Sequence, residues 1–177
     1  MRAIITIAII AGAIWLLVSN FKIPHFNCIS PGVLYTSAQP RGMDYTRLLY
    51  KYHISTIINL RSSAEHREQN WYNEEITWVR SNGVKYIEMP LDRNINNPNH
   101  FPDANMQQKF LDIMANKENL PVLIHDSKGE SRVAMLAAVW LVKDSHLPAQ
   151  QVIETASGIK ESPLADPEKN FVISLAK

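Results

Sequence analysis

The feature of this sequence that most constrains its fold is an apolar strand joined to an apolar helix by a short polar loop. Residues 120–125 read LPVLIH, the clearest buried-strand pattern in the chain, and residues 133–142 read VAMLAAVWLV, a helix with no polar face. Residues 126–132 supply the glycine and polar side chains of a turn. A strand and a helix that are both apolar all round must lie inside a layered core. The pattern therefore predicts an α/β domain, with a central sheet flanked by helices on both faces.

Weaker patterns elsewhere repeat this alternation of strand and helix. Pro and Asn are dense in residues 90–102, which predicts a loop there. Gly83 is expected to end the helix before it, and Asp103 to cap the helix after it. Smaller helices are expected after Pro148. The expected strands are residues 33–37, 56–60 and 84–89, and the expected helices are residues 45–52, 64–81 and 103–117.

The first twenty residues stand apart from the rest because residues 3–18 (AIITIAIIAGAIWLLV) contain no charge. Sixteen helical residues span about 24 Å, against roughly 30 Å for the hydrocarbon core of a bilayer. This length fits a transmembrane or signal-anchor helix, and also the core of a signal peptide. No convincing cleavage site follows, which favours an uncleaved membrane anchor. Arg2 and the terminal amine outweigh Lys22, which predicts a domain outside the cytoplasm, in a periplasm or an equivalent space.

The size and composition of the chain predict one globular domain behind this anchor. Of the 177 residues, we assign 1–20 to the anchor or signal segment, 21–30 to a linker and 31–177 to the domain. A net charge of +1 without a basic block excludes nucleic acid as an expected partner. Cys28 is the only cysteine, so no intrachain disulfide or Cys-rich zinc site can form, and we interpret it as an incidental thiol of the linker. The six histidines show no ligand spacing, so no metal or cofactor is expected. The oligomeric state is not predicted.

The loop at residues 126–132 has the composition of an oxyanion site. Backbone N–H groups of residues 127–131 can point into one concavity, and the N-terminus of the following helix adds partial positive charge. Arg132 would add a planar, two-pronged donor to the same anion. A simple tight turn between a core strand and a core helix is the alternative. The expected binding residues of this loop are Ser127, Lys128, Gly129, Glu130, Ser131 and Arg132, with the side chains of Lys128 and Glu130 in solvent.

The segment LPVLIHDSKGESRVAMLAA resembles the signature of Cys-dependent tyrosine and dual-specificity phosphatases, which is His-Cys, five residues and Arg. The matching residues are His125, Gly129, Ser131 and Arg132. Three further segments resemble the bacterial and fungal dual-specificity-like branch of this superfamily, in the same order along the chain. They are SPGVLYTSAQP (residues 30–40), STIINLR (55–61) and GVKYIEMPL (83–91). The resemblance covers residues 27–142 and implies a phosphatase-like sheet, with a phosphorylated protein or a small phosphate ester as ligand.

Two residues depart from this family pattern where the chemistry is done. Asp126 stands at the position of the nucleophilic cysteine, and Val133 stands where the family usually has Ser or Thr. Asp126 cannot form the thiophosphate intermediate. We expect its carboxylate to bind into the loop itself and to weaken phosphate binding. The resemblance then implies a degenerate phosphatase that acts as a binding module or pseudophosphatase, and the apolar run at residues 3–18 predicts that it is anchored to a membrane.

Two active alternatives remain open at this point. Asp126 itself could accept the phosphoryl group, although such sites normally use Mg²⁺ and further carboxylates, and only Glu130 is near in the loop. The chain could also be an engineered Cys-to-Asp form of an active phosphatase. Either would make the protein a phosphoric monoester hydrolase.

The resemblance also suggests residues outside the loop. Asp92 is the first candidate for the general acid and Asp103 the second, and each could instead be an ordinary turn or cap residue. Arg61 is expected to bind substrate, or alternatively to pair with an acid of the next helix. His125 is expected to support the loop rather than act as a base. The predicted catalytic set is therefore Asp126, Arg132 and Asp92.

Overall fold

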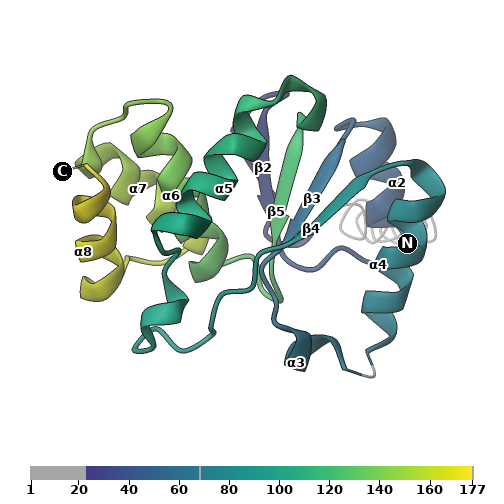
Figure 1. Ribbon diagram of the computed structural model, residues 1–177, viewed down its shortest axis with the longest axis horizontal. Coiled ribbons are helices and arrows are strands. Elements are labelled where there is room, and N and C mark those ends of the chain that lie inside the picture. The colour runs from purple at the N-terminus through teal and green to yellow at the C-terminus, as the bar shows by residue number, and fades with distance from the viewer. Residues whose placement is uncertain (1–22, 68, 177) are drawn as a thin grey trace, which may run out of the picture.

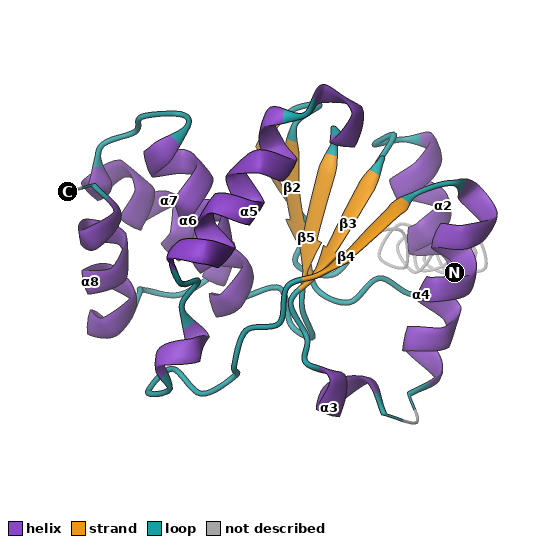
Figure 2. Cartoon of the chain, viewed as in Figure 1, coloured by secondary structure: helices purple, strands orange, loops and turns teal. Residues whose placement is uncertain are grey.

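A computed structural model describes residues 23–67 and 69–176 of the chain as a sheet with helices on both faces (Figures 1 and 2). The sheet has five strands in the order β1-β2-β5-β3-β4, and only β1 is antiparallel to its neighbour. The strands are β1 (Asn27–Ser30), β2 (Leu34–Ser37), β3 (Thr56–Asn59), β4 (Lys85–Glu88) and β5 (Val122–His125). The helices are α2 (Met43–Tyr50), α3 (Ser63–His66), α4 (Asn70–Asn82), α5 (Ala104–Ala115), α6 (Ser131–Lys143), α7 (Ala149–Lys160) and α8 (Asp166–Leu175), with short 3₁₀ turns η1 (Pro98–His100) and η2 (Lys117–Asn119).

The central strands are apolar because they bury side chains on both faces of the sheet. Successive side chains of a strand point to opposite faces. In β5, Val122 and Ile124 face one core and Leu123 faces the other, and in β3 the same division separates Ile58 from Ile57. The first core is covered by α5 to α8 and the second by α2 and α4 (Figure 1). The prediction of an α/β domain with helices on both faces is therefore confirmed.

Helix α6 is the most buried helix of the domain, as its composition predicted. Ten of its thirteen residues are buried, because β2 and β5 cover one side of it and α5, α7 and α8 cover the others. Its apolar side chains join the larger core. The helix is thereby held in a fixed position, and so is the loop at its N-terminus.

Two segments differ from what the sequence predicts. The last four residues of the expected linker form strand β1, because their backbone pairs with β2 although their side chains show little strand pattern. The expected helix at 64–81 is two helices, α3 and α4. Helix α3 is held at its start by a capping box between Ser62 and Glu65. The predicted ends at Gly83, a left-handed C-cap, and at Asp103, an N-cap that accepts from the Met106 amide at 2.8 Å, are confirmed.

The expected membrane anchor, residues 1–20, lies outside the described residues and stays a prediction. Across residues 23–67 and 69–176, no helix combines the length and the apolar character needed to cross a bilayer.

Candidate anion-binding site

The loop at residues 126–132, which we call the anion loop, lies at the carboxyl end of the central strand. His125 ends β5 and is paired in register with Ser37 of β2 and Asn59 of β3, so the loop leaves the sheet between two parallel neighbours. Gly129 adopts a φ of 75°, and a Cβ atom there would overlap the backbone at Ser37 and the next residue. Only glycine fits where the loop rests on β2.

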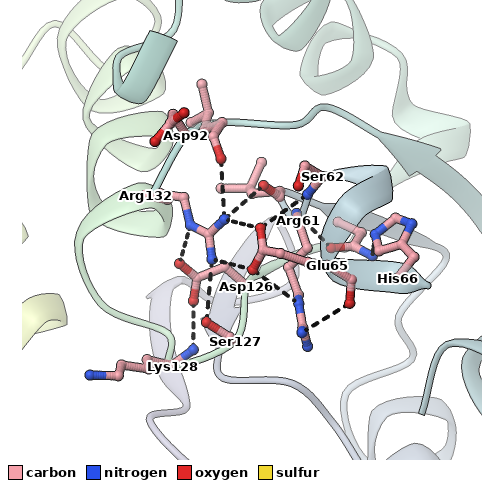
Figure 3. A network of polar contacts seen from close by, with 12 residues as sticks. Arg61, Ser62, Glu65, His66, Asp92, Asp126, Ser127, Lys128 and Arg132 are labelled. Atoms are coloured by element: carbon pink, nitrogen blue, oxygen red, sulfur yellow. Dashed lines mark hydrogen bonds and ion pairs between the residues drawn. The ribbon is translucent and has the colours of Figure 1, made fainter. Parts of the chain in front are cut away.

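Asp126 occupies the concavity of the anion loop with its own carboxylate. Its Oδ1 accepts hydrogen bonds from the amides of Lys128 at 2.9 Å and Gly129 at 2.5 Å, and its Oδ2 accepts from Arg132 Nε at 2.9 Å (Figure 3). Only 4% of Asp126 is exposed. Donors that could hold an external oxyanion are therefore bound to an internal one, as the sequence led us to expect.

Arg132 is surrounded by acceptors on every side of its guanidinium group. Its Nη1 donates to Glu65 Oε2 at 2.8 Å and to the carbonyl oxygens of Leu91 at 3.1 Å and Leu60 at 3.3 Å. Its Nη2 lies 3.4 Å from Glu65 Oε1 and 3.3 Å from Ser127 Oγ (Figure 3). The carbonyl groups belong to the segments that follow β3 and β4, so Arg132 ties the anion loop to neighbouring loops.

Glu65 is the second carboxylate of this group, and the charges stabilise one another. Burial raises the pKa of Glu65, but the hydrogen bonds from Arg132 and from the Ser62 amide outweigh it, and the net pKa lies below the ordinary value. Burial lowers the pKa of Arg132, yet the contacts with Glu65 and Asp126 raise it overall. One guanidinium thus faces two carboxylates, and the pKa shifts of Glu65 and Arg132 both favour the charged forms of these two groups.

Arg61 is held by contacts that fit the structural role considered as its alternative. Its Nε lies 3.5 Å from Glu65 Oε1, and its Nη1 donates to Gln39 Oε1 at 3.3 Å. Its guanidinium also lies over the ring of Trp71, 3.7 Å from the centroid. Arg61 therefore pairs with an acid of helix α3, and a role in substrate binding remains a prediction.

Both candidates for the general acid have other hydrogen-bonding partners. The carboxylate of Asp92 accepts from the Asn94 amide at 2.7 Å and from Asn97 Nδ2 at 2.9 Å, which shapes its own loop. It points away from the guanidinium of Arg132 (Figure 3). Asp103 caps helix α5. These contacts are those of turn and cap residues, and proton transfer by Asp92 stays a prediction.

The residue before Asp126 and the residue after Arg132, which are His125 and Val133, are both buried. His125 Nε2 lies 3.1 Å from Glu75 Oε1, and neither side chain is exposed. Glu75 also accepts from Tyr86 Oη at 3.1 Å, so His125 is fixed from the opposite face of the sheet. This position fits support of the loop. Val133 is fully buried in the larger core, where it offers no hydroxyl to the anion loop.

A cavity of about 160 Å³ opens at the mouth of the anion loop. Gly129 reaches the site through its amide, whereas the other six residues of the loop line the cavity. Within residues 23–67 and 69–176, no three His, Cys, Asp or Glu side chains are placed to share a metal ion. The cavity is lined by Asp126, Ser127, Lys128, Glu130, Ser131 and Arg132, together with Arg93 and His100 from another loop.

Four residues of the site and its surroundings were not anticipated from the sequence. Glu65 pairs with Arg132, Glu75 with His125, and both His100 and Glu168 contact Ser131. Each lies more than thirty residues from its partner in the chain. An acid of the helix after Arg61 was considered as a partner for Arg61, and this is the only signal that pointed toward Glu65.

Comparison with known proteins decides the family. The model of the tyrosine phosphatase family matches residues 22–140, about two thirds of the chain. The chain belongs to the tyrosine phosphatase family. That Asp126 stands at the position of the family's catalytic cysteine stays a prediction from the motif of the anion loop.

Similar solved structures share the fold at low sequence identity. One is the catalytic domain of the PP-IP phosphatase SIW14 from S. cerevisiae in complex with citrate, with 18% identity, 85% of this chain and 84% of that chain covered, and a TM-score of 0.69. A second is TpbA of P. aeruginosa, with 18% identity, 86% and 89% covered, and a TM-score of 0.64. A third is PTPMT1 in complex with PI(5)P, with 17% identity, 88% and 92% covered, and a TM-score of 0.63. These likenesses concern the fold.

Proposed function

We propose that this chain is a membrane-anchored member of the tyrosine phosphatase family that has lost cysteine-based catalysis and acts as a binding module. The observation that carries the proposal is the carboxylate of Asp126, which accepts the amides of Lys128 and Gly129 and the Nε donor of Arg132. A phosphate ester would need these same donors.

Charge and donor capacity both argue against ordinary phosphate binding in the wild-type loop. A guanidinium has five N–H donors, and every nitrogen of Arg132 already faces an acceptor. A dianionic ester approaching Asp126 would meet a repulsion on the order of several kcal/mol in a poorly screened pocket. Loss of a hydroxyl at Val133 removes the group that would assist the second step of the family reaction. Asp126 and Val133 both depart from the family pattern at residues of the same reaction, and two such changes favour natural divergence over an engineered substitution.

The proposed partner is a phosphorylated protein or a small phosphate ester, held near a membrane. The uninterrupted apolar run at residues 3–18 supports an anchor, and the charges beside it support a domain outside the cytoplasm. Because Asp126 occupies the inner donors, such a ligand would be held by Arg93 and Lys128 at the mouth of the cavity, and more weakly than in an unoccupied loop.

The proposal is tested by turnover and anion binding of the full chain in a neutral detergent. We expect no hydrolysis of an aryl phosphate by wild type, and phosphate binding by calorimetry at least about tenfold tighter in Asp126→Ser, where the competing carboxylate is gone. Wild-type turnover at ordinary family rates, abolished by Arg132→Ala, would contradict it.

Restoring the family residues separates the alternatives. If Asp126→Cys alone becomes active, only the nucleophile was lost, as in an engineered form. Activity that needs both Asp126→Cys and Val133→Ser indicates natural divergence. A Mg²⁺-dependent, hydroxylamine-sensitive phosphoenzyme in wild type would instead establish Asp126 as the acceptor.

A further inference from the structure

Ser131, at the start of helix α6, has a hydroxyl group held between a histidine and a carboxylate. Its Oγ lies 2.8 Å from His100 Nε2 and 2.5 Å from Glu168 Oε1. His100 is 1% exposed and follows the loop that contains Asp92, whereas Glu168 is fully buried on α8. We call His100, Ser131 and Glu168 the clamp. It joins the anion loop to two segments distant in sequence.

The outer atoms of the clamp have partners that fix where hydrogens must lie. His100 Nδ1 lies 2.8 Å from the carbonyl oxygen of Asp92, which can only accept, so Nδ1 carries a hydrogen. Glu168 Oε2 accepts from Lys160 Nζ and from the Ala165 amide, both at 2.7 Å. Only Nε2 of His100 and Oε1 of Glu168 are left to share the Ser131 hydroxyl.

The clamp therefore needs more hydrogens than its neutral-pH components supply. Ser131 has one hydroxyl hydrogen. If it donates to the Glu168 carboxylate, His100 Nε2 must donate to Ser131, which makes the imidazole a cation. If it donates to a neutral His100, Glu168 must be protonated to bond with Ser131. Both arrangements contain one proton more than a neutral histidine, a hydroxyl and a carboxylate.

We propose that His100 and Glu168 are positioning residues for the anion loop, acting through Ser131, and that the clamp closes completely only when it takes up one proton. The inference rests on the proposed anion site, since it concerns the shape of that loop. With the proton lost, Ser131 keeps one partner and releases the other. The N-terminal turn of α6 is then held less firmly against the Asp92 loop or α8.

The surrounding charges set the pH range of this change. Burial lowers the pKa of His100 below its ordinary value, and Arg132 also lowers it, whereas contacts with Asp92 and Glu168 oppose the shift. Burial raises the pKa of Glu168, but Lys160 and the other donors outweigh it and lower it overall, so the added proton resides on His100. The clamp thus closes as pH falls below about 6.5 and opens as pH rises. The other charged groups of the cavity are Arg93, Lys128, Asp126 and Glu130.

The direct test is the imidazole ¹⁵N NMR signal of His100 in the full chain in detergent. In Ser131→Ala we expect the midpoint of His100 protonation to fall by about one pH unit, a tenfold loss of proton affinity, because the bridge to Glu168 is gone. Simple attraction between the charges of His100 and Glu168 predicts no such fall, since both charges remain. Ser174→Ala removes a hydroxyl from α8 outside the clamp and should leave the midpoint unchanged. Equal midpoints in wild type and Ser131→Ala would overturn the proposal.

A second variant should close the clamp without the proton. In Glu168→Gln, the side-chain amide can donate to Ser131, whose hydroxyl then donates to a neutral His100, while the amide oxygen accepts from Lys160 and the Ala165 amide. We expect His100 to stay neutral to lower pH and the amide signals of the anion loop to lose their pH dependence. Loop signals that follow pH as in wild type would contradict the clamp.

The consequence for anion binding is measured with sulfate, a dianion across this pH range, in the Asp126→Ser background. Affinity should fall about five- to tenfold between pH 5 and pH 8 as one contact to Ser131 opens, and should not fall for this reason when Glu168→Gln is added. The same fall in both variants would overturn the positioning role. Absence of sulfate binding at every pH would remove the anion site itself, and the NMR titration would still show whether the clamp forms.

Discussion

Two neighbouring residues at the start of α6, Ser131 and Arg132, connect the anion loop to the rest of the domain in different ways. Arg132 faces two carboxylates, Asp126 and Glu65, and needs no proton beyond those present at neutral pH. Ser131 faces His100 and Glu168 and cannot satisfy both with its single hydrogen. The first set of contacts is fixed across the neutral range, whereas the second responds to pH.

The difference follows from the donors involved. A guanidinium is charged at every physiological pH and donates along five directions, so it can neutralise two acids at once. A hydroxyl has one hydrogen to donate, and it must accept from any second neighbour, which then has to be a donor. One loop can therefore be held rigidly on one side and adjustably on the other.

The largest effect is expected from removing the contacts of Arg132 with Asp126 and Glu65. Arg132→Met leaves the buried Asp126 without its cation and leaves Glu65 with Arg61 alone, so we expect a loss of about 3–5 kcal/mol in the free energy of unfolding. Urea denaturation of the full chain measures it. Arg93→Met, at the mouth of the cavity, is the control and should change stability by no more than about 0.5 kcal/mol. Similar losses in both variants would show that the carboxylates do not depend on Arg132.

A substitution at Gly129 tests the backbone of the anion loop, which carries both Ser131 and Arg132. Gly129→Ala adds a left-handed strain of about 1–2 kcal/mol and an overlap with β2 of about 1–3 kcal/mol. Gly32→Ala is a matched control, because Gly32 has a φ of 72° and no atom within 4 Å of the added Cβ. Thermal or urea unfolding should show the Gly129 variant to be the less stable of the two. Equal stabilities would mean that the loop can lift from β2 at no cost.

The smallest of these effects is expected for Glu65→Gln, which tests how the contacts of Arg132 depend on pH. Glu65→Gln should cost about 1–3 kcal/mol at pH 7, because Arg132 loses a charged acceptor. The pKa of Glu65 is lowered in the folded state, so its contribution is complete above the unfolded value of about 4.3 and is lost as pH falls through the folded value. Unfolding curves of both proteins should converge in acid. A difference that persisted at pH 2 would assign the effect to packing.

The anion loop was predictable because its donors and its shape lie within seven consecutive residues. The buried strand before it, Gly129 within it and Arg132 at its end were all visible in the sequence, and so was the expectation that Asp126 would take the amides. Spacing alone does not show that the carboxylate of Asp92 is bound to Asn94 and Asn97, so the role of Asp92 as a catalytic acid stays a prediction. Strand β1 was missed because its order comes from pairing with β2.

What the sequence determined by itself is the layered fold and the nature of the loop. Both depend on local patterns, which are the apolar periodicity, a glycine, and the presence of Asp126 and Arg132 in the same short loop. Only the tertiary structure decided the partners of that loop. Glu65, His100 and Glu168 come from three separate elements, and polar side chains find one another across such distances only after the apolar core has fixed the backbones that carry them.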